Sequence, residues 1–105
     1  MAISSTVARQ LCTKPELEIF TESLARNVTS LDAKALRSRV VRARKLRDKY
    51  QQLAHRQDRE ARGKQSPRGR RASQGSEATR KKEQLFAESL ARYEKQLAKQ
   101  EAAEA

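Results

Sequence analysis

Residues 29–62 read TSLDAKALRSRVVRARKLRDKYQQLAHRQDREAR, and this stretch decides the fold. It contains no Gly and no Pro, and it is rich in Arg, Lys, Leu, Ala and Gln, all of which favour helix. Its apolar residues recur with a period near 3.6 at Leu36, Val40, Ala43, Leu46, Tyr50, Leu53 and Ala54. The stretch therefore predicts one long helix over about 30–62 that buries a single face.

Two helix starts precede this face. Thr13 and Glu16 have the spacing of a capping box, and Pro15 stands in the first turn, so a helix is expected over about 14–27. Thr29 and Asp32 repeat the spacing and predict the start of the long helix.

The remaining segments differ in composition. Residues 1–12 show no clear period and predict a flexible N-terminus. Residues 63–78 hold all three glycines, Pro67 and three serines, which is typical of a flexible connector. Residues 79–105 predict an amphipathic C-terminal helix, with apolar residues in 4-3-4 spacing at Phe86, Leu90, Tyr93 and Leu97.

No segment shows the alternation of a strand, so the sequence predicts an all-α protein of one domain at most. Residues 13–62 would form the short helix and the long basic helix, and residues 79–105 would pack back on the long helix. An antiparallel register would place Leu53 opposite Phe86 and Ala43 opposite Leu97, with the first helix on the same apolar face. We expect an elongated three-helix bundle or helical hairpin with one long central basic helix.

A heptapeptide occurs in two nearly identical copies. Residues 20–26 read FTESLAR and residues 86–92 read FAESLAR, with six identities in seven. Each copy places Glu and Arg at i,i+4, an orientation that favours an ion pair. Convergence on good helix chemistry and an old duplication both explain the likeness, and the sequence leaves the choice open.

The positive charge is concentrated in one segment. Residues 32–71 carry fifteen basic and four acidic side chains, whereas residues 1–31 carry three of each sign and residues 72–105 carry six of each. The formal net charge of +11 therefore belongs to the long helix and the connector. Such a local field, between neutral flanks, is typical of a protein that binds a polyanion, most often nucleic acid.

The candidate nucleic-acid-binding residues lie on the polar side of the long helix and in the connector. They are Lys34, Arg37, Arg42, Arg44, Lys45 and Lys49, with Arg68, Arg70 and Arg71. Arg39 and Arg47 fall at the margins of the apolar face. Guanidinium groups favour bidentate phosphate contacts. The alternative interpretation is a soluble basic face with no partner. Ser73 follows Arg70 and Arg71 as in a basophilic kinase site, and its modification stays open.

Catalysis has little support in the sequence. His55 is the only histidine, Cys12 has no histidine near it, and no glycine-rich phosphate loop occurs. We expect no enzyme activity, no cofactor and no metal site.

Cys12 is also the only cysteine, which excludes an internal disulfide and suits a reducing cytoplasm. No run approaches the ~20 apolar residues of a membrane span, and no signal peptide is recognisable, while an organelle presequence has only Arg9 in its favour.

The sequence thus predicts a small basic helical protein that binds nucleic acid, RNA ahead of DNA, through phosphates and largely without sequence specificity. The alternative is a helical adaptor or assembly module whose apolar stripes pair between chains, as a homo-oligomer or with a helical partner. An anionic membrane surface is a weaker third interpretation, because the apolar face lacks the Trp or Phe usual for insertion.

Overall fold

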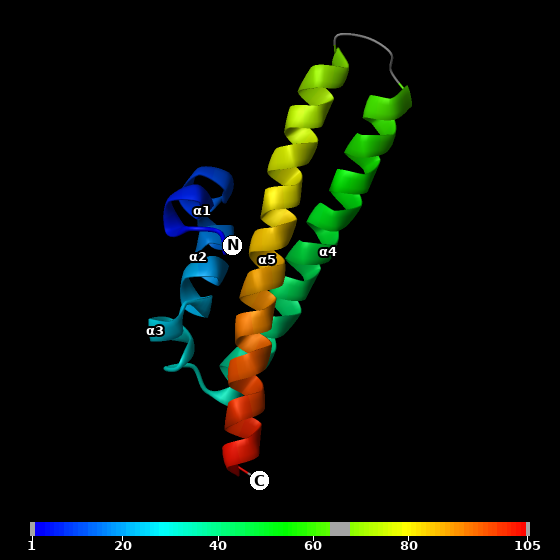
Figure 1. The fold of residues 1–105 in the computed structure, drawn as a ribbon. Coiled ribbons are helices and arrows are strands. Elements are labelled where there is room, and N and C mark those ends of the chain that lie inside the picture. Colours follow the sequence, from blue (N-terminus) through cyan, green and yellow to red (C-terminus); the bar gives the residue numbers. More distant parts are fainter. Residues whose placement is uncertain (1, 64–67, 105) are drawn as a thin grey trace.

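The computed structural model describes residues 2–63 and 68–104, with side chains for residues 2–60 and 77–103. Helices form throughout these ranges, with no strand among them, so the predicted all-α class is confirmed. The molecule is elongated, with extents of 57 × 25 × 23 Å. The helices are α1 (Ser5–Leu11), α2 (Lys14–Ser23), α3 (Ala25–Val28), α4 (Ala33–Gly63) and α5 (Arg68–Glu104) (Figure 1).

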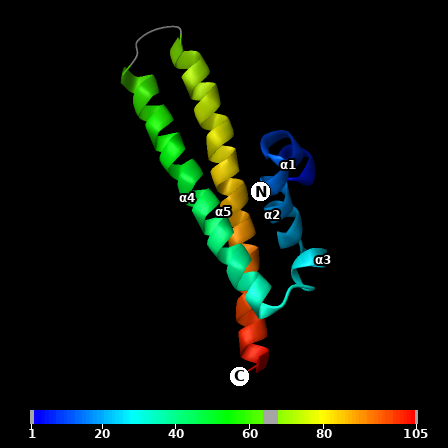
Figure 2. The ribbon, with the colours of Figure 1, turned by 180° about the vertical axis from the view of Figure 1, so that it is seen from behind.

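The two long helices, α4 and α5, form an antiparallel hairpin, and α1–α3 form an arm packed beside it (Figures 1 and 2). Among the described side chains, three ion pairs cross between α4 and α5: Arg37–Glu101, Arg44–Glu94 and Asp58–Arg80. The residue numbers of each pair sum to 138, which is what an antiparallel register requires. The sums predicted from the apolar stripes are 139 and 140, so the sequence placed the register to within one or two residues.

A thin core fills the space between the hairpin and the arm. The rings of Tyr50 and Phe86 stack with centroids 5.8 Å apart and 11° between their planes, which joins α4 to α5. Ile19 and Phe20 of α2 are 1% exposed and complete the core from the arm. Other buried apolar residues are Ala8, Val28, Leu36, Val40, Ala43, Ala54, Leu85, Leu90 and Tyr93.

The N-terminus differs from the prediction of a flexible segment over residues 1–12. Ser4 caps α1 by accepting a hydrogen bond from the Val7 N–H at 3.3 Å, and Ala8 is fully buried. The Ile3 N–H donates to Glu88 Oε1 at 2.9 Å, which ties the start of the chain to α5. Tertiary contacts order this helix, because seven residues are too few for a helix to be stable alone.

The helix predicted over 14–27 is interrupted at Leu24, so α2 and α3 are separate helices. Leu24 has φ −67° and ψ 150°, which is extended backbone. The Asn27 side-chain amide donates to the Thr21 carbonyl oxygen at 2.8 Å and satisfies a carbonyl at the end of α2. The first capping box is present as predicted: the Thr13 N–H donates to Glu16 Oε1 at 3.0 Å.

The second predicted capping box is replaced by a simpler cap. The Ala35 N–H donates to Asp32 Oδ1 at 2.7 Å, so the aspartate itself caps α4 and the helix begins at Ala33. The predicted start near residue 30 was early by about one turn, because Asp32 serves as the cap residue and not as the reciprocal acid.

The segment predicted as a flexible connector over 63–78 is helical from Arg68 onward, which lengthens α5 at its N-terminal end. Gly69 and Gly75 lie inside this helix, where each costs about 1 kcal/mol relative to Ala. Arg, Ala, Gln and Glu around them favour helix, and extending an existing helix costs little once it has nucleated. Residues 64–67 lie outside the described residues.

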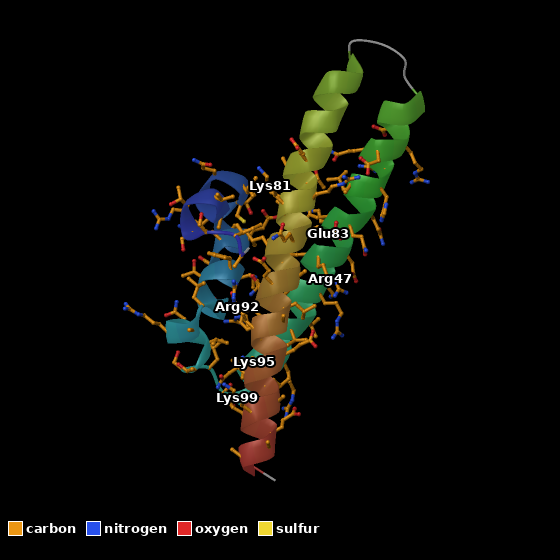
Figure 3. All side chains as sticks on the ribbon, in the orientation of Figure 1. Arg47, Lys81, Glu83, Arg92, Lys95 and Lys99 are labelled. Carbon is orange, nitrogen blue, oxygen red and sulfur yellow. The ribbon has the colours of Figure 1, made fainter. Side chains whose placement is uncertain are left out.

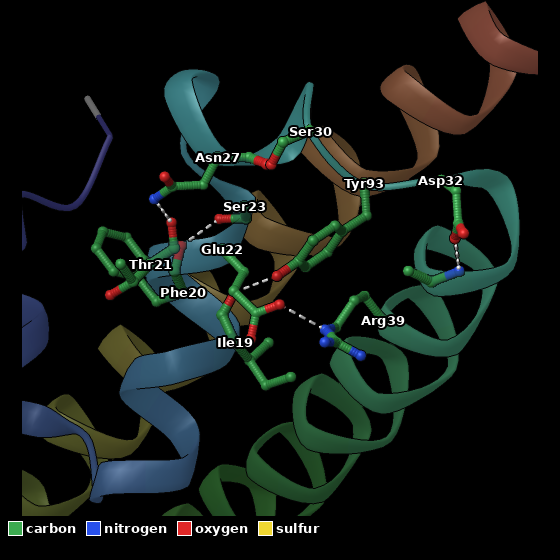
Figure 4. Close-up of polar contacts among 11 residues, drawn as sticks. Ile19, Phe20, Thr21, Glu22, Ser23, Asn27, Ser30, Asp32, Arg39 and Tyr93 are labelled. Atoms are coloured by element: carbon green, nitrogen blue, oxygen red, sulfur yellow. Dashed lines mark hydrogen bonds and ion pairs between the residues drawn. The ribbon is translucent and has the colours of Figure 1, made fainter.

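Helix α2 lies against both long helices, whereas the sequence placed it on the apolar face of the long helix alone. The Tyr93 hydroxyl of α5 donates to the Ile19 carbonyl oxygen, and Arg39 of α4 donates to Glu22 at 2.8 Å (Figure 4). Arg92 of α5 donates to Ser23 Oγ at 3.3 Å. The arm is therefore anchored by polar groups on both sides as well as by Ile19 and Phe20.

Candidate nucleic-acid interface

Six exposed cations on α4 have no carboxylate partner within the described part of the chain, and we call five of them the open basic stripe. The stripe consists of Lys34, Arg42, Lys45, Lys49 and Arg56, and the sixth cation, Arg59, lies beside its C-terminal end. Four of the stripe residues were predicted from the sequence as nucleic-acid-binding residues. The fifth, Arg56, was not, although its spacing from Lys45 and Lys34 could have identified it.

The stripe follows from helix geometry. Lys34, Lys45 and Arg56 are eleven residues apart, which is close to three full turns, so they lie nearly on one line along α4. Arg42 and Lys49 both lie on the same side of this line. At about 1.5 Å per residue the stripe extends roughly 33 Å. Arg42, Lys45 and Lys49 are neighbours at i,i+3 and i,i+4, where like charges repel.

The other predicted cations of α4 have carboxylate partners. Arg37 pairs with Glu101 at 3.8 Å and Arg44 with Glu94 at 4.0 Å, and all four side chains are about half exposed. Exposed pairs of this length contribute little to stability. They reduce the field on the α5 side of α4 without burying either guanidinium group. Arg37 and Arg44 therefore remain accessible but are partly compensated.

Arg39 and Arg47 lie at the margins of the apolar face, as the sequence predicted. Arg39 Nε donates to Glu22 Oε2 at 2.8 Å, and Arg47 contacts its neighbour Asp48 at 2.9 Å. Both guanidinium groups are thus engaged with carboxylates. The backbone of Arg68, Arg70 and Arg71 belongs to α5, but their side chains, and that of Ser73, lie outside the described residues.

Two surface hollows adjoin the stripe. One, of about 490 Å³, is lined by Lys49, Gln52, Leu53, Arg56 and Arg59, three of which are cations. The other, of about 250 Å³, lies between α2 and α4. Its apolar floor comes from Pro15, Ile19 and Leu46, and Arg42 and Lys45 stand over it. The open basic stripe therefore adjoins one hollow near its middle, at Arg42 and Lys45, and another at its C-terminal end, at Lys49 and Arg56.

A buried polar cluster joins α2, α4 and α5 where Glu16, Tyr50 and Lys82 meet. The Tyr50 hydroxyl donates to Glu16 Oε2, and Lys82 Nζ lies 3.2 Å from Glu16 Oε1. Lys82 Nζ also stands 4.7 Å above the centroid of the Tyr50 ring. Glu16 was recognised from the sequence only as part of the capping box. Lys82 was missed, because nothing in its local sequence distinguishes it from an exposed lysine.

The cluster favours its charged carboxylate. Burial acts to raise the pKa of Glu16, but hydrogen bonds from Tyr50, the Thr13 N–H and Lys82 outweigh it, so the pKa lies below its ordinary value. Burial also acts to lower the pKa of Lys82, and the hydrogen bonds to Tyr50 and Glu16 reverse this and raise it. Burial, followed by the bond to Glu16, raises the pKa of Tyr50. These groups clamp three helices together.

Both tyrosines were predicted as core residues, and both are buried, Tyr50 at 6% and Tyr93 at 0% exposure.

Burial and then Glu16 raise the pKa of the Cys12 thiol to about 11, so the nucleophilic thiolate is scarce near neutral pH. In the ranges that carry side chains, no group of three His, Cys, Asp or Glu residues is placed to hold a metal ion. None of the described helices has the length and apolar character that crossing a membrane requires.

No protein-family model, curated protein sequence or solved structure matches this chain at a significant level.

Proposed function

We propose that the protein binds nucleic acid through the open basic stripe of α4. The observation that carries this proposal is the absence of carboxylate partners for Lys34, Arg42, Lys45, Lys49 and Arg56 in the described residues. Mutual repulsion among these cations is unfavourable in the free protein. Phosphate groups along a nucleic acid would relieve it and release bound counterions.

The contacts would be to phosphates and largely without sequence specificity. Reading single-stranded bases generally requires exposed aromatic rings on which bases can stack. The four aromatic residues of the chain, Phe20, Tyr50, Phe86 and Tyr93, are all buried. RNA is favoured over DNA because residues 62–71, RGKQSPRGRR, are rich in Arg and Gly, a composition common in RNA-binding segments.

A triple variant tests the proposal. Lys34→Gln, Arg42→Gln and Lys45→Gln together remove three exposed, unpaired cations without touching the core. At about 0.1 M salt a lost phosphate contact weakens binding by at most roughly eightfold, so the loss of three contacts is expected to weaken it by roughly 30- to 500-fold. Fluorescence anisotropy with a labelled double-stranded RNA and a DNA duplex of the same length measures this.

The matched control removes the same charge elsewhere. Arg9, Lys14 and Lys81 are exposed and lie off the stripe, and replacing all three with Gln should weaken binding only a few-fold. Equal losses in the two triple variants would mean that net charge, and not the stripe, governs binding. No measurable binding by the unmodified chain at low salt would reject the proposal outright.

The second candidate, an assembly module, would need an apolar surface that is free to pair. The apolar stripes of α4 and α5 are buried against each other, and Val41, at 48% exposure, is the one large hydrophobic residue that is exposed in the described part. Light scattering at two protein concentrations in high salt separates the candidates. A concentration-dependent oligomer that survives high salt would favour assembly.

A further inference from the structure

A second basic groove lies on α5, outside the segment that holds the excess charge. It has a volume of about 290 Å³ and runs between α3 and α5. Its polar lining comes from Arg92, Lys95, Lys99 and Gln96 of α5 and from Ser23 and Thr29 of the arm, with Ala25 and Val28 as apolar floor. Figure 3 shows Arg92, Lys95 and Lys99 in succession along α5, beside the arm. We call this the α3–α5 groove.

No carboxylate lines the described part of this groove. The heptapeptide pattern predicted an ion pair between Glu88 and Arg92, but Glu88 instead accepts from the Ile3 N–H at 2.9 Å and from Gln84 at 3.1 Å. Glu94 and Glu101 face α4, where they pair with Arg44 and Arg37. The three cations of the groove are therefore left uncompensated. They are spaced at i,i+3 and i,i+4, so they repel one another as the stripe cations do.

Arg92 is held in place before any ligand arrives. Its Nη1 donates to the buried Ser23 Oγ at 3.3 Å, and its guanidinium carbon stands 5.8 Å from the centroid of the Phe20 ring. Ser23 and Phe20 belong to the first copy of the heptapeptide and Arg92 to the second, so the two copies contact each other here. An arginine fixed in this way loses less conformational freedom when it contacts a phosphate.

The arm separates the α3–α5 groove from the open basic stripe. Helix α2 packs against both long helices, with Tyr50 of α4 and Lys82 of α5 both bonding to Glu16. The hollow on the α4 flank of the arm carries Arg42 and Lys45, and the groove on the α5 flank carries Lys95 and Lys99. Two cation clusters on different helices thus flank one arm.

We infer that the α3–α5 groove is a second site for the phosphate backbone of nucleic acid, so that one molecule bridges two nucleic-acid segments. This inference rests on the proposed function of the stripe. One cluster can engage the first segment while the other remains open to a second, because each has its own cations and its own hollow. Arg92 provides the fixed contact, and Lys95 and Lys99 provide the flexible ones.

A capture experiment tests bridging directly. Biotinylated double-stranded RNA is held on beads, and a second, fluorescent duplex is recovered only if protein joins the two. The unmodified protein should recover it at low salt. The variant Lys95→Gln with Lys99→Gln should recover at least fivefold less, while its affinity for a single duplex stays within about threefold of the matched control, Lys14→Gln with Lys81→Gln. All four lysines are exposed, so neither variant disturbs the core.

Nuclear magnetic resonance gives a second readout of groove occupancy. When ¹⁵N-labelled protein is titrated with the same RNA, the amides of Thr29, Gln96 and Lys99 should shift together with those of the stripe. Bridging by the groove variant equal to that of its control, or unshifted groove amides at saturating RNA, would overturn the inference and leave the stripe proposal intact. No binding of RNA by the unmodified protein would instead reject both.

Discussion

The cationic side chains on the two sides of α4 differ in whether they have carboxylate partners. On the side that meets the arm, Arg39 pairs with Glu22 at 2.8 Å, and Tyr50, about three turns further along the helix, is bonded to Glu16 and Lys82. On the outward side, Lys34, Arg42, Lys45, Lys49 and Arg56 have no acidic partner in the described residues. The first side uses charge to join helices, and the second leaves it available.

Most of the described acidic residues with a cation partner lie where two helices meet. Glu16 and Glu22 of the arm, and Glu94 and Glu101 of α5, each meet a cation across a helix–helix contact. A solvated helix that served only solubility would mix signs along its own surface and form i,i+4 pairs. The outward side of α4 does not, and we attribute that to an anionic partner.

The largest effect is expected at the buried cluster. Glu16→Ala removes the acceptor of Tyr50 and Lys82 and also breaks the capping box of α2, so it should lower the free energy of unfolding by roughly 2–4 kcal/mol. Thermal and chemical denaturation followed by circular dichroism measure this loss. Glu18→Ala, an exposed position on the same helix, should change stability by no more than about 0.5 kcal/mol. Equal effects would show that the cluster contributes nothing specific.

A single acidic residue placed on the outward side of α4 should weaken nucleic-acid binding and slightly stabilise the free protein. Lys45→Glu gives Arg42 and Lys49 a carboxylate at i,i+3 and i,i+4, so the free protein should gain a few tenths of a kcal/mol. Nucleic-acid affinity should fall about 50-fold at 0.1 M salt, since two units of charge are lost at the centre of the stripe. Anisotropy and thermal melting on the same samples test both parts. Unchanged affinity would show that the outward side is not the binding surface.

Lowering the pH should reduce the contribution of the Glu16 cluster to the stability of the folded protein. The pKa of Glu16 in the folded protein lies below its ordinary value of 4.5, so its contribution to stability is complete above that pH and is lost as the pH falls further. Glu16→Gln should therefore be less stable than the unmodified protein at pH 7, and the difference in stability should narrow as the pH falls below 4.5. Denaturation at a series of pH values measures this difference, and a difference independent of pH would contradict this assignment.

The smallest effect is expected at the exposed pairs between the long helices. Arg37→Gln and Arg44→Gln should each change the free energy of unfolding by less than about 0.5 kcal/mol, because the pairs are 3.8 and 4.0 Å long and half exposed. They should reduce affinity less than Arg42→Gln does. A larger loss of affinity than at Arg42 would mean that the binding surface extends around α4 toward α5.

The sequence predicted the long helices and their pairing because their apolar residues follow a period of 3.6 over many turns. It missed α1 because a helix of seven residues gives too short a pattern to recognise, and only the complete burial of Ala8 in the core reveals it. It missed the break at Leu24 for a related reason. The second copy of the heptapeptide, at residues 86–92, stays helical throughout, so local sequence alone does not set the end of α2.

The candidate site was predictable in part. Charge density located it on the long helix, but periodicity could not tell which cations find partners, since Glu22, Glu94 and Glu101 come from other helices. Arg92, Lys95 and Lys99 lie in a segment whose net charge is zero. These three cations lack acidic partners because Glu94 and Glu101 pair with α4 and Glu88 bonds to the Ile3 N–H.

The salt dependence of binding tests the central claim most directly, that unpaired cations of α4 contact phosphates. Affinity for a DNA duplex is measured between 50 and 300 mM salt for the unmodified protein and for the Lys34, Arg42 and Lys45 triple variant. If five stripe cations each neutralise one phosphate, log K should fall with log salt at a slope near −4.5, and the variant slope should be shallower by about 2.7. A shallow slope for the unmodified protein, or the same slope for both, would contradict the account.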